Sequence, residues 1–328
     1  MGFKRKIKRI TEEIKATFKI AKVTSFSKAI NTFKGKYEIQ KMVKNGYHET
    51  PKAKKILLKK HDTMIEYFEK TFGEYLSNYN FNENIPDGNP EYSNNIWICW
   101  WQGIDKSPEI VKACVDSIKK NSGTHHVVIL TEENYKNYIT FPDWILKKVK
   151  EGIISKTNLS DLLRFSLLAK HGGMWLDSTF FAIGDLSKYF ENDIWSIKRP
   201  GYLHCSVAGG MFAGYSLYCS YENRWMFNVM RDFFLHYWEI NNLLIDYLLV
   251  DYMVVLAQKH DIRIKNAFDR IESNNPNCDN LEPVLFKIFD YEYWKKISCD
   301  TKLFKLTWKK NFSKVDLNSF YKKIIIKL

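Results

Sequence analysis

The sequence predicts an α/β fold in which a mainly parallel sheet is flanked by helices. Strand-length apolar runs at residues 95–101, 126–130 and 174–176 alternate with segments at 108–120 and 159–171 whose apolar residues recur at helical spacing. Such alternation is typical of a parallel sheet, because a helix carries the chain back between parallel strands. The basic, helix-patterned first residues predict a helical region ahead of the sheet.

The chain divides in two at a turn-rich stretch. Pro86-Asp87-Gly88-Asn89-Pro90 is the best candidate for a linker. We therefore expect a basic helical N-terminal region at residues 1–90 and a sheet domain at residues 91–328. With 328 residues, of which 45% are apolar, the chain can build a core and an accessory region.

The positive charge of the chain belongs to its beginning. Residues 1–60 hold 18 Lys and Arg against 4 Asp and Glu, which accounts for the net charge of +13 of the whole chain. Apolar residues in this segment recur at helical spacing, namely Phe3, Ile7, Ile10, Ile14, Phe18 and Ala21. A basic amphipathic helix favours contact with an anionic membrane through residues 1–45. Packing of the helix on its own domain or on another subunit is the alternative.

The first predicted strand ends in aromatic residues. Asn95 to Gly103 reads as an apolar strand that closes on Trp100 and Trp101, and Ser107-Pro108-Glu109 begins a helix. Tryptophans on a strand are usually core residues, so the pattern alone favours packing for both.

The helix at 159–171 carries a carboxylate and a guanidinium side by side. Its leucines (Leu159, Leu162, Leu163, Leu167 and Leu168) share one face. Asp161 and Arg164, at i and i+3, are neighbours on another. Thr157 or Asn158 can cap its start, and Gly172 can end it in a left-handed conformation. An ordinary intrahelical ion pair is the simplest interpretation of Asp161 and Arg164.

A second carboxylate follows the next strand. Residues 174–176 predict a short buried strand, so that Asp177 stands at its carboxyl end. In open α/β sheets ligands bind at that edge. A capping role in the following turn is the alternative for Asp177.

The order of these pieces resembles a known family. Ser160-Asp161-Leu162-Leu163-Arg164 followed by Gly172-Gly173-Met174-Trp175-Leu176-Asp177 resembles the core motif of the capsular polysaccharide synthesis family of glycosyltransferases. The wider group includes the yeast-type outer-chain mannosyltransferases and the glucosylating clostridial toxins. The resemblance extends from about residue 95 to 309. It implies a GT-A (Rossmann-like) fold, a nucleotide-sugar donor and transfer with retention of anomeric configuration.

The resemblance also implies roles for the motif residues. Asp161 and Arg164 would hold hydroxyls of the donor, and Trp100, or failing that Trp101, would stack on the nucleotide base. Asp177 would contact ribose and a divalent cation, Mn²⁺ or Mg²⁺. Thr179 stands where the second Asp of the family's Asp-x-Asp motif is expected, so any cation would be held weakly by Asp177 and Thr179.

Two further segments supply candidates. Residues 242–259 predict one buried helix, on which Asp246 or Asp251 is a candidate for contacting substrate hydroxyls. Pairing with Arg224 or Arg231 is as good an explanation for these carboxylates. Residues 305–309 resemble the loop that closes over the diphosphate, with Lys309 favoured as the phosphate ligand over Lys305.

The resemblance therefore implies a retaining hexosyltransferase that uses a UDP-sugar in preference to other donors and a lipid-linked glycan acceptor. We expect it to be cytoplasmic and peripheral at the inner face of the plasma membrane, since no segment predicts a signal peptide or a membrane span and no Cys-x-x-Cys pair occurs. A catalytically degenerate scaffold that binds nucleotide sugars is one alternative. A nucleic-acid-binding protein is another, but the basic arm lacks a nucleic-acid motif, so we expect no nucleic-acid partner.

Overall fold

The computed structural model describes residues 3–81 and 85–327 of the chain. The α-helices are α1 (Phe3–Val23), α2 (Phe26–Lys44), α3 (Pro51–Ser77), α4 (Glu109–Asn121), α5 (Asp143–Lys150), α6 (Lys156–His171), α7 (Trp225–Ile240), α8 (Leu249–His260), α9 (Ile262–Arg270) and α10 (Tyr291–Ser298). Short 3₁₀ helices occupy Pro90–Asn94, Ile104–Lys106, Tyr135–Asn137, Ser187–Glu191 and Glu282–Val284, and a π-helical turn occupies Tyr321–Ile326.

The central sheet is mixed, with most strands running one way. It is formed by β1 (Asn95–Cys99), β2 (His126–Leu130), β3 (Gly173–Leu176), β5 (Ile194–Ser196) and β6 (Ser216–Cys219), in the order β2-β1-β3-β6-β5. β1 pairs in parallel with both β2 and β3. β6 is antiparallel to β3 and to β5, so it alone runs against the others in this sheet. The predicted α/β fold with a mainly parallel sheet is confirmed.

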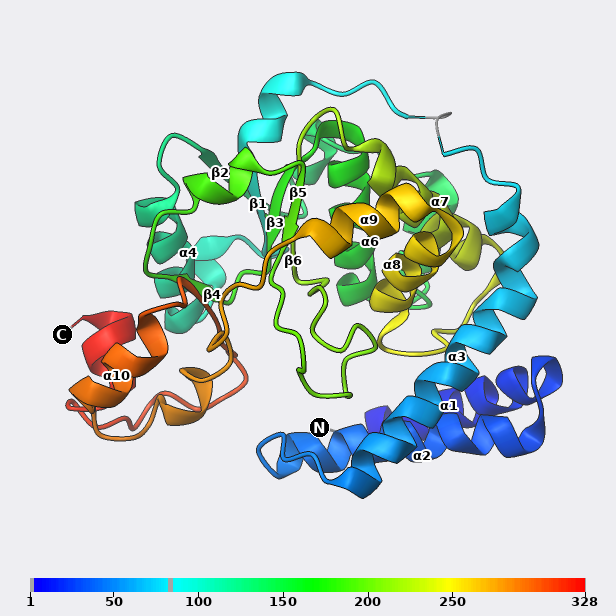
Figure 1. Ribbon diagram of the computed structural model, residues 1–328, viewed down its shortest axis with the longest axis horizontal. Coiled ribbons are helices and arrows are strands. Elements are labelled where there is room, and N and C mark those ends of the chain that lie inside the picture. The colour runs from blue at the N-terminus through cyan, green and yellow to red at the C-terminus, as the bar shows by residue number, and fades with distance from the viewer. Residues whose placement is uncertain (1–2, 82–84, 328) are drawn as a thin grey trace.

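Helices cover the sheet on both sides. α4 lies on one side, while α6 and α7 lie on the other together with α8 and α9 (Figure 1). The buried strand residues Ile96, Trp97, Met174 and Leu176 join the core of this layered unit. The topology places the carboxyl ends of β1 and β3, and the start of β6, at one edge of the sheet.

The N-terminal region is helical, as the sequence predicts. α2 begins at the cap Ser25 and α3 at the cap Thr50, each of whose side chains accepts from a backbone amide of the first turn. α3 buries Met64, Phe68 and Phe72, which belong to the main core, and it contacts α8. The division into regions 1–90 and 91–328 stays a prediction.

The last part of the chain forms a smaller unit. β4 (Phe180–Ala182) and β7 (Leu303–Lys305) pair antiparallel, with Phe180 opposite Lys305. α10 and the C-terminal turn, which lie below α4 in Figure 1, pack beside this pair on a second core to which α4 also contributes. The pairing of β7 with β4 therefore brings a segment that is distant in sequence next to the residues that follow β3.

Three local expectations need correction. Residues 242–259 do not form one helix, because α8 begins only at Leu249 and Asp246 lies before it, where its side chain accepts from the Leu248 amide. α6 is capped by Ser155, and Asn158 lies inside the helix. Gly172 has a positive φ of 72°, but its ψ of −153° lies outside the left-handed helical region.

Two further findings concern membrane spans and cysteines. No helix within residues 3–81 and 85–327 is long and apolar enough to cross a membrane. The six cysteines are free thiols, and only Cys299 is exposed.

Candidate functional site

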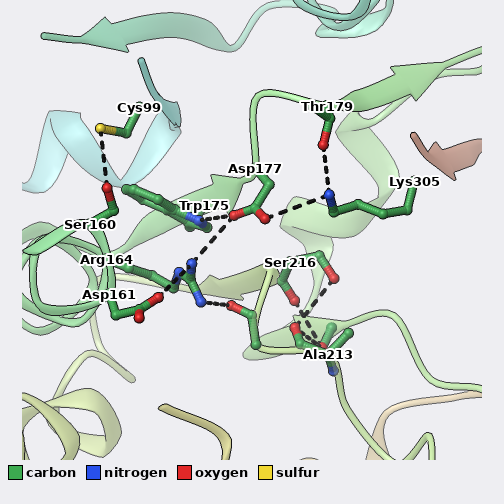
Figure 2. A network of polar contacts seen from close by, with 12 residues as sticks. Cys99, Ser160, Asp161, Arg164, Trp175, Asp177, Thr179, Ala213, Ser216 and Lys305 are labelled. Carbon is green, nitrogen blue, oxygen red and sulfur yellow. Dashed lines mark hydrogen bonds and ion pairs between the residues drawn. The ribbon is translucent and has the colours of Figure 1, made fainter. Parts of the chain in front are cut away.

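Polar side chains from three segments meet at the carboxyl edge of the sheet (Figure 2). Asp177 directly follows β3, and its backbone amide donates to the Tyr215 carbonyl at 3.1 Å, just ahead of β6. α6, which precedes β3, contributes Asp161 and Arg164. The sequence prediction that these three residues meet in one place is therefore realised in the structure.

Arg164 holds the group together. Its Nη2 lies 3.2 Å from Asp161 Oδ1 and 3.3 Å from Asp177 Oδ1, and its Nη1 donates to the Gly214 carbonyl. The guanidinium also lies over the Trp175 ring, with 5.0 Å between Cζ and the ring centroid. The ion pair between Asp161 and Arg164 within α6 is present, but Arg164 also binds Asp177 and the Gly214 carbonyl. Arg164 is only 5% exposed, so it contacts and orients both carboxylates from the buried side of the group.

Asp177 is the most accessible of the three. Its side chain is 32% exposed, and Oδ1 accepts from Trp175 Nε1 at 3.1 Å. Oδ1 is committed to Trp175 and Arg164, whereas Oδ2 has Lys305 Nζ at 3.8 Å. A carboxylate fixed in this way can accept hydrogen bonds from the hydroxyls of a ligand.

Asp251 of α8 completes the group, although the sequence pattern did not favour it over Asp246. Its carboxylate lies against Gly214, where an added Cβ would stand 2.5 Å from Asp251 Oδ1. Glycine at position 214 thus lets Asp251 approach the backbone that also binds Arg164.

Burial shifts the acid–base behaviour of both inner carboxyls. Burial, together with the charges of Asp177 and Asp251, raises the pKa of Asp161 to about 7, against the opposing effect of Arg164. Burial also raises the pKa of Asp251 to about 6, again opposed by Arg164. Near neutral pH a protonated Asp161 can donate a hydrogen bond as well as accept one.

The expected cation ligands are not arranged for a metal. Lys305 of β7 donates to Thr179 Oγ1 at 2.6 Å, and its Nζ lies 3.8 Å from Asp177 Oδ2. Both expected ligands therefore already face an ammonium. Across residues 3–81 and 85–327, no three His, Cys, Asp or Glu side chains are grouped so that they could hold a metal ion. This donor set does not fit Mn²⁺ or Mg²⁺, because only one of the two expected ligands is anionic and an ammonium already faces both.

The two candidate tryptophans take different positions. Trp101 is buried, and its Nε1 donates to Ser160 Oγ at 2.8 Å, so it is a packing residue. Trp100 is half-buried and meets Trp308 edge to face, with ring centroids 5.8 Å apart. Trp308 is 44% exposed and was not singled out by the sequence, although it lies within the segment 305–309. Trp100 is thus the better placed of the two for contact with a base.

Asp246 and Lys309 lie apart from this group. Asp246 is 2% exposed and pairs with the fully buried Lys60 of α3 at 3.0 Å, so its partner is neither Arg224 nor Arg231. The Lys309 side chain is exposed, and within the described part of the chain it makes no ion pair. Lys305, which the sequence ranked second, is the lysine that reaches Asp177.

Tyr247 is a further residue that sequence reasoning missed. The residue is 73% exposed, and burial of its hydroxyl together with the charges of Asp161, Asp177 and Asp251 raises the pKa of Tyr247. It belongs to the irregular segment before α8. Because the sequence predicted one continuous helix here, it did not indicate where the Tyr247 side chain would lie.

Comparison with known protein families identifies the family of this chain. The model of the family described as capsular polysaccharide synthesis protein matches residues 44–324. The chain belongs to this family. The match includes α3 and every residue of the site described above. None of the curated proteins matches this capsular polysaccharide synthesis protein.

Among solved structures, a chain described as PaToxG glycosyltransferase is similar to it. The two share 16% sequence identity with a TM-score of 0.34, over 63% of this chain and 83% of that one.

Proposed function

We propose that this capsular polysaccharide synthesis protein is a glycosyltransferase that moves a hexose from a nucleoside diphosphate sugar to a hydroxyl group of a glycan acceptor. UDP is the favoured nucleotide. The observation that carries the proposal is the convergence of Asp161 and Asp177 on Arg164 at the carboxyl edge of the sheet. Vicinal hydroxyls of ribose and hexose suit such carboxylates, which accept two hydrogen bonds at fixed positions.

Each residue has a role in this proposal. Asp177, the most exposed of the three side chains, binds ribose, and Asp161 binds the hexose. Trp100 and Trp308 receive the base, because aromatic faces stack on any base. Arg164 is a positioning residue that fixes both carboxylates.

The transfer proceeds with retention. The bond between the anomeric carbon and the diphosphate oxygen breaks, and a bond from the acceptor oxygen to that carbon forms on the same face. The leaving diphosphate oxygen takes the acceptor's proton, so we assign no covalent nucleophile. Charge that develops on the diphosphate must be stabilised for the first bond to break.

The acceptor is proposed to be lipid-linked, at an anionic membrane surface on the inner face of the plasma membrane. Support comes from an apolar face of α1 and α2, formed by Ile14, Phe18, Phe26 and Phe33, which surrounds a hollow of about 170 Å³. These four side chains are between 47% and 62% exposed, whereas Ala16 and Ile20 of α1 are buried. Exposed basic residues such as Lys15, Lys22 and Lys34 flank this face. An apolar face with basic neighbours suits anionic lipid.

A donor panel tests the proposal. Thermal denaturation is measured with UDP, GDP and their hexose conjugates, because a ligand that binds only the folded state raises the apparent melting temperature. Donors that stabilise the protein are then incubated with it, and released nucleoside diphosphate is measured. Stabilisation with hydrolysis supports a transferase, whereas stabilisation without hydrolysis or transfer indicates a scaffold. Absence of any shift across the panel contradicts the proposal.

A further inference from the structure

Lys305 is held beside the turn that follows β3 by its backbone. It stands opposite Phe180 in the β4–β7 pair, its amide donates to the Cys278 carbonyl at 2.8 Å, and the next amide, of Leu306, donates to the Thr179 carbonyl at 2.9 Å. These bonds bracket the residue on both sides. The fold therefore fixes the backbone of Lys305 beside this turn.

The side chain is equally constrained. Nζ donates to Thr179 Oγ1 at 2.6 Å and lies 3.8 Å from Asp177 Oδ2. It lies 5.8 Å from the centroid of Phe180 and 5.6 Å from that of Tyr215. Yet 22% of the side chain remains exposed, so a ligand can still reach the ammonium. An ammonium has three donors, of which one is used by Thr179 and one makes a long bond of 3.5 Å to the Leu306 carbonyl.

A divalent cation and this ammonium would compete for one place. A metal ion bound to Asp177 Oδ2 and Thr179 Oγ1 would sit about 2.1 Å from each oxygen, and so within a few ångströms of Nζ. Two cations at that separation repel strongly in a partly buried site. With threonine at position 179, the metal would also lack the second carboxylate that could offset this repulsion.

We infer that Lys305 takes the place of the divalent cation, so that this protein binds the diphosphate of its donor without a metal ion. The inference rests on the proposed function and gives it a catalytic residue. Lys305 stabilises the negative charge on the diphosphate as the sugar leaves, and it gives up no proton. A charge-assisted hydrogen bond to phosphate is the interaction it supplies.

Titration calorimetry with UDP and GDP tests the inference. Binding to the full-length protein is measured in EDTA and again in excess MnCl₂, for the wild type and for Lys305→Met, Lys305→Arg and Lys296→Met. Lys296 lies exposed on α10 and controls for the loss of one positive charge. A melting curve of each variant shows whether it is folded.

We expect the wild type to bind with the same affinity, within about twofold, in EDTA and in MnCl₂. Lys305→Met should bind at least tenfold more weakly in both, Lys305→Arg should recover part of the loss, and Lys296→Met should match the wild type. Binding of the wild type only with MnCl₂, or a folded Lys305→Met variant of unchanged affinity, overturns the inference and leaves the proposed function standing. Absence of nucleotide binding in both buffers overturns the proposed function, and the inference with it.

Discussion

Arg164 Nη2 lies 3.3 Å from Asp177 Oδ1, and this contact joins α6 to the end of β3. The same nitrogen reaches Asp161, and Nη1 reaches the Gly214 carbonyl. One planar group thus fixes three segments of the chain. The fork geometry of a guanidinium makes this possible, and an ammonium does not reproduce it.

The variant Arg164→Lys tests this role. A lysine keeps the charge but cannot reach all three acceptors, so buried oxygens lose their partner. We expect at least a tenfold loss of UDP affinity and a decrease of about 1–3 kcal/mol in the free energy of unfolding. Titration calorimetry and urea denaturation measure the two effects. Arg270→Lys, at an exposed position on α9, is the control. Unchanged values in Arg164→Lys would show that the bridge is not needed.

Asp161 makes the stability of the protein depend on pH. Its folded-state pKa is raised to about 7, mainly by burial, so the folded protein binds more protons than the unfolded chain above pH 4. The stability that the protonated carboxyl contributes is complete below the ordinary pKa of about 4 and is lost as the pH rises through about 7.

The variant Asp161→Asn should therefore gain stability relative to the wild type as the pH rises from 4 to 8. The relative gain is at most about 4 kcal/mol across this range. Urea denaturation of both proteins without ligand, at several pH values, measures it. Asp105→Asn, at an exposed position, controls for the loss of a charge. A difference between Asp161→Asn and wild type that stays constant with pH would contradict the shifted pKa.

The ion pair of Lys60 and Asp246 joins α3 to the segment before α8. Both side chains are buried, and Lys60 Nζ also donates to the Tyr252 hydroxyl at 3.1 Å. Replacing Lys60 by Met leaves the buried Asp246 carboxylate with Lys36, whose Nζ lies farther away at 3.9 Å, and with the Leu248 amide. We therefore expect a loss of up to about 3–5 kcal/mol in the free energy of unfolding.

A double-mutant cycle with Asp246→Asn checks this pairing. The two changes together should cost less than the sum of the single changes, because each single change leaves one partner unpaired. Donor affinity of the folded Asp246→Asn variant should equal that of the wild type. A specific loss of donor affinity in that variant would show that Asp246 contributes to the substrate site.

The apolar face of α1 and α2 predicts binding to anionic vesicles. Phe18→Ser combined with Phe26→Ser removes two of its four side chains, each of which gains about 2 kcal/mol on burial. We expect at least a tenfold weaker partition into phosphatidylglycerol vesicles, with donor binding unchanged. Tyr291→Ser, at a residue 64% exposed on α10, is the control. Equal partition of the double variant and the wild type would rule out this face as the membrane contact.

The sequence predicted the parts of the site that depend on local patterns. Asp161, Arg164 and Asp177 lie within seventeen residues of one another, on a helix and a strand whose periodicity is plain. Lys305 was only a secondary candidate, because it reaches Thr179 through a strand pairing that spans 126 residues. No local pattern specifies such a pairing. The sequence did not indicate a role for Gly214 for a related reason. The need for glycine at this position comes from the close approach of Asp251 and Arg164, which are distant in sequence.

Long-range contacts also explain where the predicted elements differ from the observed fold. The apolar residues from 242 to 259 suit one buried helix, but Asp246 turns toward Lys60 of α3, and α8 starts three residues later. The strands β4, β5 and β7 are three residues long, too short to show a period. Tertiary contacts decided these elements.

The most direct measurement is a calorimetric titration of UDP into the wild type and into Asp177→Asn. Asp177 offers the accessible carboxylate of the group, and asparagine keeps its size while removing the charge. The account predicts saturable binding to the wild type and at least tenfold weaker binding to the variant. Equal affinity of the two proteins for UDP would contradict a nucleotide-sugar site at Asp161, Arg164 and Asp177.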